Sequence, residues 1–406
     1  MNGLTETINN EEICNSRSGD KPFVIHVTTI GITSYRALLA QCVYFREKGM
    51  DVGFVFSPSP EGELLRHLGF PVKEILINRR IDLLADSMAI LKMRSYFRRM
   101  RPDIVHTHTS KAGIVGRVAA KLAGVPKIIH TVHGFPFHPG MSRLKYRVYQ
   151  QIEKSTAAIT DILLSQSRED IVTASELGIK SRMGKVIHIG NGIDLNEFDP
   201  GKYSTRRRLQ IREALMLSES DPVITMIGRV NQEKGYQDLV EALNGVRDVP
   251  WQALFIGPDE GYLSSVKHRI KHYGLQDRIK ILGQRSDITD LLAITDIYVL
   301  PSYREGLPRS LIEAQSMGLP CVATDIRGCR EVVKRGVTGL LTRPGDSKAL
   351  GESLHTLLLE PELRLRMGQE GRKHMQQHFD EAEVSRKVMA IYEKVNQLSS
   401  YTSKRN

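Results

Sequence analysis

The sequence predicts an α/β protein of two doubly wound, Rossmann-like domains that face a cleft. Short runs of apolar and β-branched residues alternate with helical patterns through both halves of the 406-residue chain. Runs that are apolar at nearly every position are typical of parallel sheets with helices on both faces. A stretch rich in Asn, Asp, Gly and charge separates the halves at residues 191–210, and a chain of this length has room for two cores. Because ligands of such sheets bind at the carboxyl ends of the strands, polar residues that follow a strand are the site candidates.

The first half contains seven predicted strands, at residues 22–29, 51–57, 71–76, 103–109, 127–133, 162–167 and 185–192. Helical patterns fill the intervals, for example at residues 35–49 and 111–124. We therefore assign residues 22–200 to an N-terminal domain. Residues 1–21 are polar and lack the apolar core of a signal peptide, so they are predicted to form a disordered leader.

The second half repeats the alternation with six predicted strands, at residues 222–228, 251–257, 278–283, 296–301, 320–325 and 338–343. This pattern assigns residues 201–380 to a C-terminal domain. After Gly351 the pattern is helical throughout. Residues 381–406 are predicted to form a helix that packs back on the N-terminal domain.

The composition favours anionic partners, because the formal net charge is +11 at pH 7 and such a balance attracts nucleic acid, anionic lipid or phosphorylated substrates. Two basic amphipathic segments, at 91–102 and 139–154, either pack their apolar faces inward or dock on an anionic membrane surface. Their cations are not interleaved with exposed strand aromatics, so no nucleic acid is expected as a partner. Four scattered cysteines and the lack of an apolar run of roughly 18 residues predict a cytoplasmic protein, peripheral at most on the inner face of the cell membrane.

The segment "GRVNQEKG" (residues 228–235) follows a predicted strand. Gly228 permits a close turn, Arg229 and Lys234 supply two cations, and Gly235 opens the next helix. Cations beside a helix N-terminus suit a diphosphate. The alternative is a solvated loop with surface cations. The residue order fits neither a Walker P-loop nor G-x-G-x-x-G.

The segment "YREGLPRSLIEA" (residues 303–314) places Glu305 in a loop after a strand and Glu313 inside a helix that Pro308 would start. The two carboxylates flank the free amides of the first helical turn. This order suits a ligand with hydroxyls at both ends and phosphate in the middle. The alternative is that Glu305 favours a helix N-terminus while Glu313 pairs with Arg309, a contact worth tenths of a kcal/mol.

Several segments together resemble the retaining glycosyltransferases of the GT-B fold, family 4 type. "EGLPRSLIEA" resembles their E-x7-E motif, and "GRVNQEKG" resembles their G-R-x(4)-K-G loop. "GLPCVATDIRGCREVV" resembles their G-x-P-V-V-A-T-x-x-G-G-x-x-E-x-V segment, with Cys329 in place of the second glycine. "NGID" resembles the entry to their domain linker, and "HTVHGFPFH" resembles the His-Gly turn of their acceptor domain. The resemblance spans residues 22–395.

The resemblance implies roles for individual residues. The implied catalytic residues are His133 beside the anomeric carbon, Glu305 on hydroxyls of the donor sugar, and Arg229 and Lys234 on the diphosphate leaving group. Glu313 would bind the ribose. The other donor-binding positions implied are Gly31, Gly228, Arg285, Gly306, Leu307, Pro308 and Arg309. Gly31 is a single glycine where the family often has a pair.

Histidines crowd one region of the first half: His106, His108, His130, His133 and His138. A metal site is one interpretation. However, His106 and His108 share one face of a strand, and no nearby carboxylate completes a ligand set. We therefore predict hydrogen-bonded histidines, with no metal and no cofactor.

These observations predict a retaining glycosyltransferase that moves a sugar from a nucleotide donor, a UDP-sugar by family analogy, to a hydroxyl acceptor. The same analogy suggests a lipid-linked glycan in surface polysaccharide assembly as the acceptor. Two alternatives remain. One is a UDP-sugar 2-epimerase of the same architecture, and the other is a non-catalytic, membrane-associated subunit.

Overall fold

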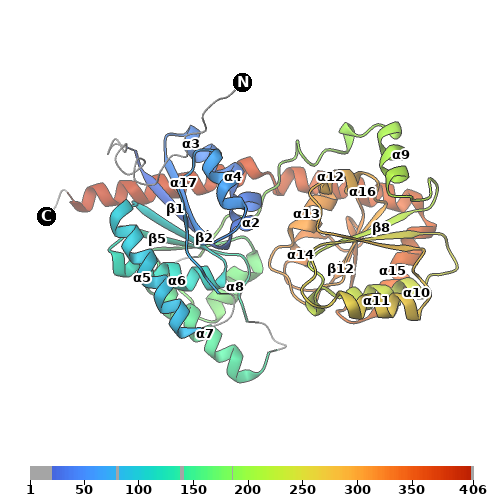
Figure 1. The fold of residues 1–406 in the computed structure, drawn as a ribbon, viewed down its shortest axis with the longest axis horizontal. Helices are drawn as coiled ribbons and strands as arrows, with labels where there is room; N and C mark the ends of the chain where they lie inside the picture. Colours follow the sequence, from blue (N-terminus) through green and yellow to red (C-terminus); the bar gives the residue numbers. More distant parts are fainter. Residues whose placement is uncertain (1–20, 79–81, 138–140, 185, 404–406) are drawn as a thin grey trace. The chain divides into compact units, whose positions relative to one another are not determined.

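The computed structural model describes residues 21–78, 82–137, 141–184 and 186–403 (Figure 1). The predicted leader, apart from Lys21, lies outside the described residues, and so does His138. The chain divides into two compact units. The first comprises Met1–Gly190 together with Ala382–Asn406, and the second comprises Asn191–Glu381.

Among the described residues, the first unit forms a seven-stranded parallel sheet in the order β3-β2-β1-β4-β5-β6-β7. The strands are β1 (Phe23–Ile30), β2 (Asp51–Ser57), β3 (Val72–Glu74), β4 (Ile104–His108), β5 (Lys127–Val132), β6 (Ile162–Ser165) and β7 (Val186–His188). The helices are α2 (Gly31–Thr33), the π-helical η1 (Ser34–Leu38), α3 (Leu39–Glu47), α4 (Glu61–His67), α5 (Leu83–Met100), α6 (Ser110–Ala123), α7 (Arg143–Ala157), α8 (Arg168–Glu176) and α17 (Glu381–Ser403).

Helices cover both faces of this sheet, which is why its strands are apolar throughout. On one face, α3, α4 and α17 pack against residues such as Val24 and Phe54. On the other face, α5 and α6 lie side by side over Phe23 and Val105 (Figure 1). The C-terminal helix α17 thus packs back on the first sheet, through Tyr392 and its neighbours, as the sequence predicts.

The second unit forms, among the described residues, a six-stranded parallel sheet in the order β10-β9-β8-β11-β12-β13. The strands are β8 (Val223–Ile227), β9 (Gln252–Ile256), β10 (Ile279–Gly283), β11 (Ile297–Leu300), β12 (Cys321–Thr324) and β13 (Gly339–Thr342). The helices are the 3-10 helix η2 (Pro200–Lys202), α9 (Thr205–Ala214), the 3-10 helix η3 (Gln232–Lys234), α10 (Tyr236–Asn244), α11 (Leu263–His272), α12 (Ile288–Ala293), α13 (Arg309–Ser316), α14 (Cys329–Val332), α15 (Ser347–Leu359) and α16 (Pro361–His378).

The second sheet is also covered on both faces. Helices α10, α11 and α15 pack on the face that carries Met226 and Phe255. Helices α13, α14 and α16 pack on the face that carries Tyr298 and Leu300. The prediction of two doubly wound α/β domains is therefore confirmed. Within the described residues, no helix combines the length and the apolar character needed to cross a membrane.

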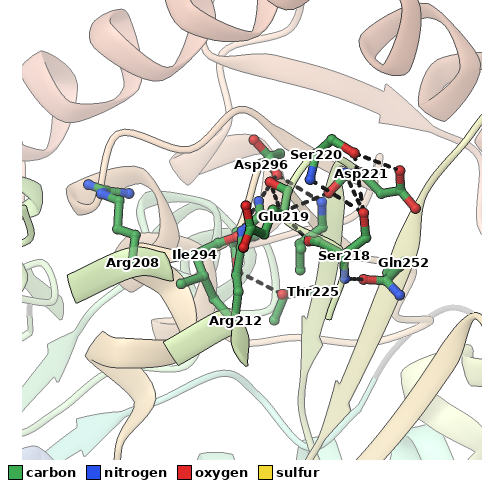
Figure 2. A network of polar contacts seen from close by, with 12 residues as sticks. Arg208, Arg212, Ser218, Glu219, Ser220, Asp221, Thr225, Gln252, Ile294 and Asp296 are labelled. Carbon is green, nitrogen blue, oxygen red and sulfur yellow. Dashed lines mark hydrogen bonds and ion pairs between the residues drawn. The ribbon is translucent and has the colours of Figure 1, made fainter. Parts of the chain in front are cut away.

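A polar network fixes the amino ends of β8 and β11 (Figure 2). Arg212 on α9 donates to the carbonyl oxygens of Ser218, Glu219 and Asp221 and to the carboxylate of Asp296. The same carboxylate accepts the amide N–H that opens β8, at 2.8 Å. Because these partners hold α9 and the loop before β8 against the sheet, the network is structural.

Candidate active site

The loop after β8 places the side chain of Lys234 across Gly228. A Cβ at residue 228 would lie 3.3 Å from Cδ of Lys234, so glycine leaves room for the lysine stem. Gly235 has a φ of +74°, and a Cβ there would lie 2.1 Å from the carbonyl oxygen of Pro301. The positive φ and the close approach both require glycine. The loop is therefore fixed against the carboxyl end of β11.

The ion pair between Lys234 and Glu305 joins the loops after β8 and β11. Lys234 Nζ lies 2.5 Å from Oε1 of Glu305, and the two side chains are only 16% and 12% exposed. The backbone N–H of Tyr303 donates to the carbonyl of Glu233, at 2.8 Å, and ties the same loops together. The structure thus brings together two residues that the sequence assigns to one donor molecule.

Arg229 is held by a carboxylate that the sequence analysis missed. Its Nη1 lies 2.8 Å from both carboxylate oxygens of Glu260, and Asn231 donates to the same group at 2.9 Å. Glu260 follows β9, the strand beside β8. The rule that ligand groups follow strands, applied to the predicted strand 251–257, would have found Glu260.

The turn before α13 is shaped by a second close approach between backbones. Gly328 has a φ of +81°, and a Cβ there would lie 1.6 Å from the carbonyl oxygen of Gly306 and 3.3 Å from Cδ of Pro308. The residue of this turn that needs a positive φ is therefore Gly328. Cys329, which follows it, has no positive φ and is fully buried. A cysteine in place of the second family glycine is thus compatible with this turn.

Glu313 and Arg285 each lie in a side-chain ion pair of the second unit. Arg309 Nε lies 3.2 Å from Oε1 of Glu313, which is on the following turn of α13, so the pairing considered from the sequence is present. Arg285 follows β10 and binds Asp287 through two hydrogen bonds, of 2.8 and 2.5 Å. These hydrogen bonds lower the pKa of the Asp287 carboxyl below its ordinary value.

The order of the strands arranges these loops along one edge of the second sheet. Since parallel strands end on the same side, the loops after β10, β9, β8, β11 and β12 follow one another in that order. They carry, in turn, Arg285, Glu260, Lys234, Glu305 and Gly328. The second unit therefore presents charged groups of both signs along this edge.

His133 follows β5 in the first unit and is partly exposed. Its Nε2 lies 3.2 Å from Nδ1 of the buried His108. Burial lowers the pKa of His133 to about 4, against an opposing hydrogen bond with Gln166. The imidazole is therefore neutral near pH 7, which suits a hydrogen-bonding role better than a charged one.

Gly31 has a packing reason for being glycine that the sequence did not reveal. A Cβ there would lie 2.1 Å from Oγ of Ser59 and 3.1 Å from a carboxylate oxygen of Glu61. The start of α2 is thus pressed against the loop after β2. Space for a ligand is not needed to explain this glycine.

Three buried imidazoles form the group best suited to a metal ion in the described part of the chain. Ligand atoms of His26, His106 and His108 lie within 4.8 Å of one another. Both nitrogens of His106 are already hydrogen-bonded, to the hydroxyls of Tyr392 and Thr131. Hydrogen bonds therefore account for both nitrogens of His106 without an ion, and the prediction of no metal stays a prediction.

Comparison with known proteins identifies the family. The model for "Glycosyl transferase 4-like domain" matches residues 31–192, and that for "Glycosyl transferases group 1" matches residues 207–374. A UDP-Gal:alpha-D-GlcNAc-diphosphoundecaprenol alpha-1,3-galactosyltransferase of Escherichia coli is 31% identical over 334 residues, which cover 80% of this chain and 84% of that protein. The chain belongs to the glycosyltransferases of family 4 type.

Further relatives agree with this assignment. The capsular polysaccharide biosynthesis glycosyltransferase CapM of Staphylococcus aureus is 27% identical over 376 residues, covering 91% of this glycosyltransferase and 96% of CapM. The solved structure of Anabaena Alr3699/HepE in complex with UDP and glucose shares the fold, with a TM-score of 0.78, 22% identity and coverage of 92% and 100%. The predicted family, GT-B fold and enzyme class are confirmed, so the non-catalytic subunit is set aside.

Proposed function

We propose that this glycosyltransferase moves a sugar from a UDP-sugar to a hydroxyl of a lipid-linked glycan, with retention at the anomeric carbon, in surface polysaccharide assembly. The main support for the proposal is the Lys234–Glu305 pair. Lys234 would bind a phosphate of the donor, and Glu305, whose carboxylate lies 2.5 Å away, would bind hydroxyls of the donor sugar. The name of the E. coli relative gives a UDP-galactose donor and a diphosphoundecaprenol acceptor. These printed activities support the donor and acceptor classes proposed here.

In this proposal, Arg229 and Lys234 stabilise the departing diphosphate. Each cation is held by one carboxylate, Glu260 or Glu305, on a neighbouring loop. A diphosphate offers several charged acceptor oxygens, so it can share or replace these partners without unfolding a strand. Preorganised cations of this kind stabilise charge that develops in the transition state. Neither glutamate acts as a nucleophile.

The turn from Gly306 to Arg309 would bind the middle of the donor. The first amides of a helix have no acceptor within the helix, and those of α13 follow Pro308, its N-cap residue. The close contact of Gly328 with Gly306 holds this turn in place. Glu313, partly buried on the same helix, would bind the ribose, and the Gly283–Arg285 backbone would bind the base.

The first unit offers a surface for the membrane that holds a lipid-linked acceptor. Within the predicted basic segment 91–102, Met93 and Phe97 are buried, so that part of α5 packs inward. Exposed apolar residues lie instead on the first half of α5 and on α7: Leu83, Leu84, Met88, Leu91, Leu144 and Val148. Leu91, Leu144 and Val148 have basic neighbours in the sequence, and apolar side chains with basic neighbours suit an anionic lipid surface.

Transfer assays with purified protein test the proposal. We would incubate the enzyme with UDP-sugars and a synthetic lipid-diphosphate-linked acceptor and determine the anomeric configuration of the product by NMR. A product with the donor's configuration is expected. An inverted product would exclude retention, and binding of a GDP-sugar but not of any UDP-sugar would exclude the proposed donor.

The epimerase remains a second candidate because the donor site alone would serve it. Incubation with the donor in the absence of an acceptor separates the two activities. Interconversion of two UDP-sugars under these conditions would favour the epimerase. An unchanged donor that is consumed only when the acceptor is added supports the transferase.

A further inference from the structure

Three histidines of the first unit form a continuous hydrogen-bonded chain that ends at His133. Nδ1 of His26 lies 2.9 Å from Nε2 of His108, and Nδ1 of His108 lies 3.2 Å from Nε2 of His133. His26 lies on β1, His108 ends β4, and His133 follows β5. His26 and His108 are fully buried, whereas His133 is partly exposed. We call these three residues the histidine chain.

All three rings are neutral at physiological pH. Burial lowers the pKa of His26 to about 3 and that of His133 to about 4, and it holds the pKa of His108 well below its ordinary value. A neutral imidazole carries one N–H donor and one acceptor nitrogen. Each contact between rings needs one of each, so the tautomer of one ring fixes the tautomers of the other two. Only two arrangements of the chain are then consistent.

The buried end of the chain distinguishes these two arrangements. Nε2 of His26 is buried and has no hydrogen-bond partner among the described residues. The ring centroid lies 6.3 Å from that of Phe45 and 6.0 Å from that of Phe54. In one arrangement this nitrogen carries an unpaired N–H, and in the other it carries an unpaired lone pair. Buried N–H groups without an acceptor are the rarer of the two. The second arrangement therefore holds: Nδ1–H of His26 donates to His108, and Nδ1–H of His108 donates to His133.

We propose that His26 and His108 are positioning residues that fix His133 as the Nδ1–H tautomer. The hydrogen bond at one imidazole nitrogen decides which nitrogen keeps the proton. With Nε2 of His133 occupied as an acceptor, Nδ1–H is the single N–H donor of the ring. This atom would donate to an oxygen of the sugar, sharing or replacing the hydrogen bond that His133 makes with Gln166. This inference rests on the proposed function, which supplies the contact between His133 and the sugar. It adds that Nδ1 of His133 is the atom that donates the hydrogen bond.

The neighbouring His106 provides an internal control because it lies outside the histidine chain. Its ring centroid is 4.2 Å from that of His108, but its nitrogens bond to Tyr392 and Thr131. Replacing Tyr392 with Phe removes one of these hydrogen bonds in the same buried cluster. A change in His133 that came from general loosening of the cluster would appear in Tyr392→Phe as well.

Nitrogen NMR of enzyme labelled with ¹⁵N-histidine, without any donor, tests the proposal directly. The His133 signals are assigned by their loss in His133→Asn. We expect a pyridine-type Nε2 and a pyrrole-type Nδ1 for His133. The reverse assignment overturns the proposal, and so does stoichiometric zinc in the purified protein coordinated by His26 and His108.

Two substitutions of His108 add a kinetic test. His108→Gln keeps an amide that can accept from His26 and donate to His133, whereas His108→Leu keeps neither. We expect the native His133 spectrum and near-native kcat for His108→Gln and for Tyr392→Phe. For His108→Leu we expect mixed tautomers and a kcat lower by about tenfold at unchanged donor KM.

Equal losses in His108→Gln and His108→Leu would contradict the proposal. If His108→Leu does not fold, the wild-type spectrum and His108→Gln still decide the outcome. If the wild-type enzyme transfers no sugar from any donor, the proposed function fails, yet the spectrum of the free enzyme still tests the tautomer of His133.

Discussion

An arginine lies at each end of the sheet in the second unit, but the two arginines have different hydrogen-bond acceptors. At the amino end, Arg212 donates to four carbonyl oxygens and one carboxylate, and its side chain is 11% exposed. At the carboxyl end, Arg229 is 45% exposed, and both of its ion-pair hydrogen bonds go to Glu260. Lys234 on the same loop bonds to Glu305.

This difference separates a structural cation from one that is available to a ligand. Backbone carbonyls beside a strand cannot leave Arg212 unless the chain around them unfolds. A carboxylate on a loop can exchange its cation with a phosphate, because both are anionic acceptors of similar geometry. We therefore infer a structural role for Arg212 and propose a ligand-binding role for Arg229, although their charges and contact distances are similar.

Glu305→Gln should produce the largest effect and should act on catalysis alone. Glutamine keeps the shape and a contact with Lys234, but it loses the charge that we propose binds a sugar hydroxyl. We expect kcat/KM to fall by about a thousandfold, on the scale of a lost transition-state contact. Thermal melting should change little. Kinetics with near-normal turnover in this variant would remove Glu305 from the donor site.

Arg212→Met should do the opposite, lowering stability while leaving catalysis intact. The four carbonyls, three of them in partly buried contacts, and Asp296 would lose their donor, which costs about 3 kcal/mol of unfolding free energy in total. Trp251 is the sole tryptophan of the chain and is buried in the second unit, so its fluorescence during urea unfolding reports this change. The value of kcat/KM at low temperature should stay within about twofold.

Arg207→Met is the matched control for this prediction. Arg207 lies on the same helix, but it is 52% exposed and its ion pair is with Asp290. Exposed pairs of this kind contribute less than about 1 kcal/mol. Equal destabilisation by the two substitutions would show that burial and carbonyl acceptors do not distinguish Arg212.

Sequence patterns predicted the strands of both sheets, because strands buried on both faces are apolar at almost every position. They also predicted which loops carry charge, since Glu305 and Lys234 lie in the segments that follow two strands. They could not show that these two side chains touch, because that contact depends on β8 and β11 being neighbours in the sheet.

Other features of the structure were not predicted, most of them because they depend on packing between segments that are distant in the sequence. Glu260 was missed although its position after β9 was a usable signal. The close approach at Gly31 and the histidine chain each need strands to be placed side by side, which periodicity does not do. In α5 the basic segment was recognised, but the exposed Leu83 and Leu84 lie just before it.

Arg229→Ala should have an intermediate effect at the carboxyl end. It removes one of the two proposed diphosphate cations and leaves Lys234 in place. We expect kcat/KM to fall by about thirtyfold, or ~2 kcal/mol, with unfolding by Trp251 fluorescence unchanged. Arg269→Ala is the control, because Arg269 pairs with Glu241 at a similar distance but on helix surfaces. A similar loss in both variants would show that overall charge, rather than position, matters.

The smallest predicted effect extends the comparison to the first unit, where the buried His26 is neutral rather than part of an ion pair. Burial lowers the pKa of His26 from 6.5 to about 3, so below pH 6.5 the unfolded chain binds a proton that the folded chain does not. Stability should therefore decrease as the pH falls from 6.5 towards 3, and His26 alone contributes about 1 kcal/mol of that loss by pH 5.5. His26→Asn should reduce the pH dependence of hydrogen exchange in β1 by this amount, whereas substitution of the exposed His272 should not.

Unfolding of the second unit, followed by the fluorescence of Trp251, is a control and should have the same pH dependence in His26→Asn as in the wild type. Because other buried histidines of this unit also have a lowered pKa, part of the pH dependence should survive. A pH dependence of β1 exchange that is unchanged in His26→Asn would mean that His26 does not contribute to it.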